Sequence, residues 1–149
     1  MSNPDQFYAV DLLRHSQTLE SFLIGSQNQD SSVTLHSGFN EFNHVELLTC
    51  YDPQWKSFAD MAASIGQGPD ANKLFQKEFA KALERWVGGK FDSDYKESWP
   101  QFKKRCVSAL QDVINQELLS KQRLDNEKSS QDICIFTSGG NIAVIIQNI

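Results

Sequence analysis

The chain has 149 residues, of which 40% are hydrophobic and 22% charged, and its formal net charge is −5. These values are typical of one globular domain with a sizeable core and exclude general disorder. The acidic balance argues against a nucleic-acid surface, which needs clustered positive charge. No apolar run approaches the ~20 residues of a membrane helix, and the N-terminus has no signal-peptide pattern.

The three cysteines, Cys50, Cys106 and Cys134, are odd in number and widely spaced. Two of them sit in apolar patterns, which favours buried thiols in a reducing compartment over disulfides or a metal site. We therefore expect a soluble, cytoplasmic protein.

The first third of the chain predicts two short strands around one helix. Residues 7–10 are apolar and predict a strand, and a helix follows from residue 12 or 13 to residue 25, because its apolar residues recur near one face. Residues 33–35 predict a second strand. An irregular segment over residues 38–42 follows, in which Glu41 lies between two aromatic residues.

The middle of the chain predicts helices. They cover residues 43–51 and 55–65, and Asp70 is expected to cap a third that runs to residue 87. Residues 98–101 have the form of a capping box with proline in the first turn. The helix that they begin carries apolar residues at spacings of three and four as far as Leu118.

The last segment predicts a buried strand and a final helix. Residues 133–136 form a continuous apolar run, which is typical of a strand covered on both faces of a parallel sheet. A Thr-Ser-Gly-Gly turn over residues 137–140 leads into a helix over residues 141–147. The alternation predicts an α/β fold with a mainly parallel sheet and a helical insertion at about 43–97.

The turn at residues 137–140 is a candidate anion site. A strand that leads into a helix start places unpaired backbone N–H groups and the positive end of a helix dipole at one point. Gly139 and Gly140 allow a close backbone approach, and Ser138 supplies a hydroxyl. The alternative is an ordinary strand-to-helix turn, because such turns favour glycine.

Arg14 and Glu41 are each open to two interpretations. A carboxyl group between aromatic residues can have a raised pKa and act as a general acid, but an isolated loop glutamate is more often solvated. Arg14 is either a surface residue or a clamp for a bidentate acceptor. The three histidines have no metal-ligand spacing, so no metal is assigned. The basic run at 103–105 predicts only a solvated face.

Together these stretches resemble the histidine phosphatase superfamily, which has the phosphoglycerate mutase-like fold, and in particular its bacterial branch of phosphoglycerate mutase family proteins. The resemblance covers nearly the whole chain. It is carried by Leu-Arg-His-Ser-Gln-Thr at 13–18, Gly-Phe-Asn-Glu-Phe-Asn-His at 38–44, Glu-Arg-Trp-Val-Gly at 84–88, Glu-Ser-Trp-Pro-Gln-Phe at 97–102 with Arg105 and Cys106, and Phe-Thr-Ser-Gly-Gly at 136–140.

The resemblance implies a three-layer α/β/α fold and a single, incomplete domain over residues 1–149. It implies hydrolysis of a small-molecule phosphomonoester without a cofactor, through covalent catalysis on a histidine. Arg14 matches the family's later phosphate-binding arginine, and Glu41 matches the acid that protonates the leaving group. Ser138 stands where most members carry a second histidine, and Gly139 lies at the phosphate.

A second alignment would make His15 the nucleophile, with Ser16 in place of the glycine of the family's Arg-His-Gly motif. The spacing favours the first alignment, because only 26 residues separate Arg14 from Glu41. The opening motif should be followed by another strand-helix unit before such an acid, and this further unit is not present. Under that alignment the family's nucleophile and first strand are missing, the C-terminus stops early, and Met1 is either internal to a longer parent or the start of a truncated gene. We then expect an inactive or weak phosphatase, or a non-catalytic module that binds phosphate or a partner.

Overall fold

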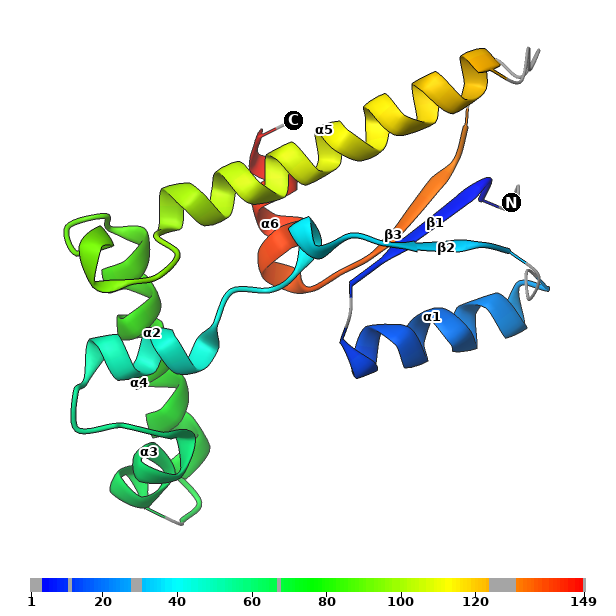
Figure 1. Ribbon diagram of the computed structural model, residues 1–149. Coiled ribbons are helices and arrows are strands. Elements are labelled where there is room, and N and C mark those ends of the chain that lie inside the picture. Colours follow the sequence, from blue (N-terminus) through cyan, green and yellow to red (C-terminus); the bar gives the residue numbers. More distant parts are fainter. Residues whose placement is uncertain (1–3, 11, 28–30, 67, 124–130, 149) are drawn as a thin grey trace. The chain divides into compact units, whose positions relative to one another are not determined.

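The computed structural model describes residues 4–10, 12–27, 31–66, 68–123 and 131–148 (Figure 1). The chain forms two compact units, one made of Met1–Glu41 and Lys103–Ile149 and the other of Phe42–Phe102. In chain order the elements are β1 (Gln6–Ala9), α1 (Leu13–Gly25), β2 (Val33–Leu35), the 3-10 helix η1 (Ser37–Phe39), α2 (His44–Tyr51), α3 (Phe58–Ile65), α4 (Ala71–Val87), the 3-10 helix η2 (Asp92–Asp94), α5 (Trp99–Arg123), β3 (Ile133–Phe136) and α6 (Gly139–Asn148).

The first unit is built on a three-stranded parallel sheet with the strand order β2-β1-β3. Phe7 of the central strand lies opposite Val33 on one side and Cys134 on the other. The predicted α/β class with a parallel sheet is therefore confirmed. The finer likeness to the phosphoglycerate mutase fold stays a prediction.

Helices cover both faces of this sheet. Successive side chains of a strand point to opposite faces, so β1 contributes to a core on each side. Phe7 and Ala9 pack with Leu19 of α1 on one face. Tyr8 and Val10 face the other way and pack with residues of α5 and α6. Figure 1 shows the resulting arrangement, in which the sheet lies between α1 and the pair α5 and α6.

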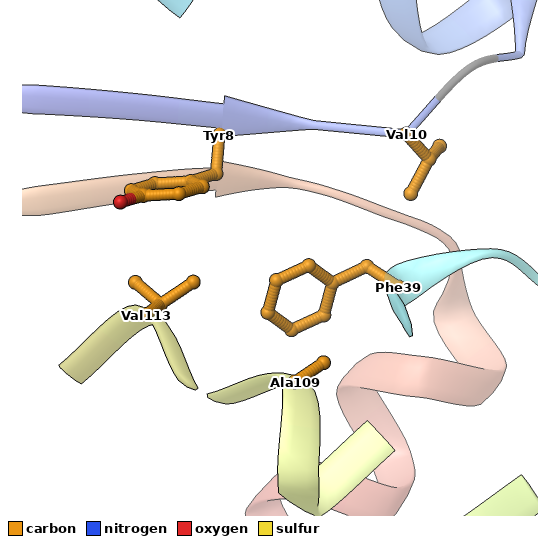
Figure 2. Close-up of a cluster of buried hydrophobic side chains, with 5 residues drawn as sticks. All are labelled: Tyr8, Val10, Phe39, Ala109 and Val113. Atoms are coloured by element: carbon orange, nitrogen blue, oxygen red, sulfur yellow. The ribbon is translucent and has the colours of Figure 1, made fainter. Parts of the chain in front are cut away.

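Phe39 anchors the segment after β2 in the core that α5 covers. Its side chain is 0% exposed and lies between Val10 and Ala109 (Figure 2). The preceding Gly38 leaves room for this contact, since a Cβ at that position would lie 2.5 Å from the Cβ of Ala109. The backbone therefore approaches α5 more closely than any other residue type would permit at position 38.

Strand β3 is covered on both faces but is less buried than its apolar sequence predicts. Ile133 and Ile135 pack with one core cluster, while Cys134 and Phe136 pack with the other. All four are only half-buried. The reason is the position of β3 at an edge of the described sheet, where β1 is its single neighbour.

The second unit contains the predicted helical insertion, with its limits moved from about 43–97 to 42–102. Helices α2, α3 and α4 enclose a core of Leu48, Met61 and Ala82. Helix α3 begins three residues later than predicted, because the Ser57 side chain accepts a hydrogen bond from the Asp60 N–H and caps the helix there. That the two units belong to one domain stays a prediction.

The other helix limits agree closely with the sequence. Helix α1 begins at Leu13, and α4 begins after Asp70, although the Asp70 side chain makes no capping hydrogen bond. Half of the predicted capping box is present at α5, where the Ser98 N–H donates to Gln101 Oε1 over 2.8 Å. Helix α6 begins at Gly139, two residues before the predicted start.

All three cysteines lie in the described part of the chain, and none of them forms a disulfide. Within the same residues, no helix combines the length and apolar character that crossing a lipid bilayer requires.

The buried pair of Tyr8 and Glu117 generates a test of the core. The Tyr8 hydroxyl donates to Glu117 Oε1, and the two residues are 1% and 5% exposed. Burial raises the pKa of Tyr8, and so does the Glu117 carboxylate. We expect Tyr8→Phe to lower the free energy of unfolding by about 1–3 kcal/mol, because a buried acceptor loses its donor.

Urea unfolding of Tyr8→Phe, Glu117→Leu and the double variant measures this contribution. The double variant should be more stable than the sum of the two single effects predicts, because it leaves neither partner unsatisfied. Strictly additive losses would show that the hydrogen bond contributes nothing.

Candidate functional site

The candidate site lies at the edge of the sheet where all three parallel strands end. Arg14 and His15 follow β1, Glu41 follows β2 and η1, and Ser138 and Gly139 follow β3. Ligand sites of parallel sheets form outside the carboxyl ends of the strands. The structure therefore brings the sequence-predicted residues to one edge of the first unit.

Arg14 and His15 lie in the first turn of α1. The His15 N–H donates to the Leu12 carbonyl over 2.8 Å, so the chain is already helical at this point. The alternative alignment makes His15 the nucleophile, and the structure places His15 within α1, not at the end of β1. Arg14 is where the phosphate-clamp interpretation requires it, while its role stays a prediction.

Ser138 connects the end of β3 to the first turn of α1. Arg14 Nη2 donates to Ser138 Oγ over 3.0 Å, across 124 residues of sequence. Ser138 is only 7% exposed, whereas the Arg14 side chain reaches it from an exposed position. A guanidinium group has five N–H donors, and this bond uses one of them. Arg14 therefore has the capacity to hold Ser138 and an anion together.

His15 is buried against the same hydroxyl. It is 8% exposed, and its Nε2 lies 3.1 Å from Ser138 Oγ. Its Nδ1 is also buried and has no well-aligned partner among the described residues. Burial lowers the pKa of His15, and the Arg14 charge lowers it further, while the Thr137 backbone and Glu41 act in the opposite direction. The surroundings of His15 in the empty site therefore favour the neutral imidazole.

Glu41 reaches the site through the start of α6. Its Oε2 accepts a hydrogen bond from the Gly140 N–H over 3.2 Å. The first N–H groups of a helix have no partner within the helix, so a side-chain oxygen can accept a hydrogen bond from them. This contact places the Glu41 carboxyl group beside Gly140, which is two residues after Ser138 in the sequence.

Gly139 is the first residue of α6 and borders open space. A Cβ built at this position meets no atom within 4 Å. The packing of the protein therefore does not require glycine here. A ligand that approaches the helix start would meet the backbone without an intervening side chain.

The segment that carries Glu41 is held by residues that the sequence did not identify. Thr137 Oγ1 donates to the Phe39 carbonyl over 2.8 Å. Asn141, which is fully buried, donates to the Asn40 carbonyl over 3.1 Å, and its Oδ1 lies 2.9 Å from the Cys106 sulfur. The available signal was a polar residue in the first turn of an otherwise apolar helix.

Arg105 corrects the expectation that residues 103–105 form a solvated face. The side chain is half-buried, and its Nη1 donates to the carbonyl oxygens of Gly38 and Asn40 over 2.9 and 2.8 Å. One guanidinium nitrogen thus bridges two carbonyl groups of the turn that precedes Glu41. No local pattern predicts this, because the acceptors lie more than 60 residues away in sequence.

The remaining histidines have other surroundings. His36 Nδ1 accepts a hydrogen bond from the Gly38 N–H and caps η1, and His44 belongs to the other unit. Across the described ranges, no group of three or more His, Cys, Asp or Glu side chains gathers closely enough to hold a metal ion.

No protein-family profile, curated protein or solved structure matches this chain. The chemistry of the site therefore has to follow from the geometry of Arg14, His15, Glu41 and Ser138.

The bridge made by Arg105 generates a second prediction. Arg105→Met removes the charged donor from two carbonyl groups, and we expect a loss of about 1.5–3 kcal/mol in the free energy of unfolding. Lys104→Met is the matched control, since Lys104 is an exposed neighbour on the same helix and should change stability by less than about 0.5 kcal/mol.

Denaturant unfolding measures both losses, and amide hydrogen exchange locates them. Exchange should quicken in residues 38–41 of Arg105→Met and not in the Lys104→Met control. Equal stability and exchange in the two variants would show that the bridge does not hold this segment.

Proposed function

We propose that this site binds the phosphoryl group of a small-molecule phosphomonoester, as a histidine phosphatase does. The observation that carries the proposal is the 3.0 Å contact between Arg14 Nη2 and Ser138 Oγ at the start of α6. A guanidinium group, a hydroxyl group and a helix N-terminus are three kinds of donor that recognise phosphate. Here Arg14 comes from a part of the chain that is distant in sequence from Ser138 and the start of α6.

Each residue then has a chemical part. Arg14 would bind two phosphoryl oxygens in a bidentate manner, and Ser138 and the backbone at Gly139 would bind a third. Glu41 would protonate the leaving oxygen from its position beside Gly140. The ordered motifs that resemble histidine phosphatases support the same assignment.

We expect hydrolysis to be weak. Phosphoryl transfer to histidine needs an accessible ring nitrogen, but His15 has its Nε2 bonded to Ser138 and its Nδ1 buried. A serine at position 138 also cannot become a cation, and losing a charged donor costs ~2–4 kcal/mol of transition-state stabilisation. These observations favour a second candidate function, a phosphate-binding module without turnover. The same observations argue against phosphorylation of His15.

Calorimetry with inorganic phosphate tests the proposal. Arg14→Ala should weaken binding about 10- to 100-fold, because it removes charged hydrogen bonds worth about 1.5–3 kcal/mol. Gln17→Ala is the matched control, since Gln17 is also exposed on α1 and lies outside the site. Absence of binding to the wild type at millimolar phosphate, or equal affinity in both variants, would contradict the proposal.

Hydrolysis of p-nitrophenyl phosphate separates the two candidate functions. A weak phosphatase should lose its turnover in Arg14→Ala and Glu41→Gln, whereas a binding module shows none in any variant. Mass spectrometry after incubation with substrate would reveal a phosphohistidine. Rapid turnover that ignores both substitutions would exclude the assigned roles.

Gly139 provides a test that leaves the fold intact. Gly139→Ala adds a methyl group that meets no protein atom within 4 Å, so the melting temperature should not fall. If phosphate approaches the start of α6 closely, the same methyl group should weaken binding. Gly25→Ala is the control, because its Cβ also meets nothing within 4 Å and it lies at the far end of α1. Unchanged phosphate affinity in Gly139→Ala would place the ligand elsewhere.

A further inference from the structure

The phosphoryl-binding roles assigned above leave out a buried titratable group that is one hydroxyl away from the ligand position. His15 Nε2 contacts Ser138 Oγ at 3.1 Å, and Arg14 Nη2 contacts the same oxygen at 3.0 Å. Building on the proposed function, we propose that His15 is a positioning residue that takes up a proton when a phosphate dianion binds. Protonated His15 then fixes the Ser138 hydroxyl as a donor to the phosphoryl group.

The hydrogen-bonding capacity of Ser138 supports this role. A serine hydroxyl has one hydrogen and two lone pairs, and the Arg14 donor takes one lone pair. If His15 accepts the hydrogen, none remains for a ligand. A protonated imidazole can only donate, so it takes the second lone pair and leaves the hydrogen for a phosphoryl oxygen. For the neutral tautomer that carries its hydrogen on Nδ1, protonation of His15 therefore reverses the direction of this hydrogen bond.

The balance of charge points the same way. The charged groups that act on His15 are Arg14 on its own helix and Glu41 from the segment after η1, while Thr137 and Ser138 at the end of β3 are uncharged. Arg14 contributes one positive charge, so a bound dianion would leave at least one uncompensated negative charge beside a buried imidazole. A proton on His15 offsets one such charge.

The sign of the resulting pH dependence follows from the pKa of His15. In the empty site, burial and Arg14 hold this pKa below its ordinary value. A bound dianion offsets the effect of Arg14 and favours the protonated ring, so the pKa is higher in the occupied site. Affinity is greatest below the empty-site pKa and falls as the pH rises, by at most about tenfold per pH unit. Above the occupied-site pKa it is constant again.

Calorimetry with inorganic sulfate tests the inference, because sulfate stays a dianion over the range of about pH 5.5–8.5 in which histidine titrates. Titrations in two buffers with different ionisation enthalpies give the number of protons taken up per sulfate bound. The wild type should take up a proton within the window and bind more tightly at lower pH. An NMR titration should show the pKa of His15 rising with sulfate, with His36 and His44 as internal references.

Two variants show whether His15 is the group that titrates. His15→Gln keeps an amide that can hydrogen-bond to Ser138 but cannot titrate, so we expect weaker, pH-independent binding without proton uptake. His44→Gln is the control, because His44 belongs to the other unit, and it should retain the wild-type proton uptake. If His15→Gln does not fold, the NMR titration of the wild type decides.

The outcomes separate this inference from the proposed function. Sulfate binding to the wild type with no proton uptake, or proton uptake that persists in His15→Gln, would overturn the inference and leave the phosphoryl site in place. If neither sulfate nor phosphate binds to the wild type, the proposed function fails and the inference fails with it.

Discussion

The parallel pairing of β1 with a strand on each side is the constraint on which the candidate site depends. Parallel strands end at the same edge of a sheet, so the segments that follow β1, β2 and β3 all begin there. This pairing brings Arg14 to Ser138 and Glu41 to the start of α6. An antiparallel neighbour on either side would send one of these segments to the opposite edge.

Packing below the sheet edge holds the backbone that the site needs. Phe39 fills the core, Gly38 lets the chain approach α5, and Arg105 and Asn141 take the carbonyl groups of the same turn. Glu41 follows immediately, so its carboxylate starts from a fixed backbone. The polar residues that fix this turn thus act on the site without touching the position proposed for the ligand.

Much of the fold could be predicted from the sequence, because helix periodicity, caps and apolar runs are local signals. The starts of α1 and α5, the limits of β2 and the convergence of Arg14 with Ser138 follow from such signals and from the rule for parallel strands. The edge position of β3 could not be predicted, since a local apolar run does not encode the number of neighbouring strands. The bonds of Arg105 and the burial of His15 depend on groups that are distant in sequence, which no single stretch reveals.

The residues that meet at Ser138 are far apart in the sequence. Arg14 and Ser138 are 124 positions apart, and the whole of the second unit is encoded between them. During translation β1 and β2 leave the ribosome before β3, so β1 can pair with β2 before β3 is available on its other side. Closing so long a loop adds little to the free-energy cost of folding, because the entropy of loop closure grows only logarithmically with loop length. Such long-range contacts do slow folding. The contact between Arg14 and Ser138 can therefore form only after β3 has been synthesised, and a nascent chain released before β3 would lack it.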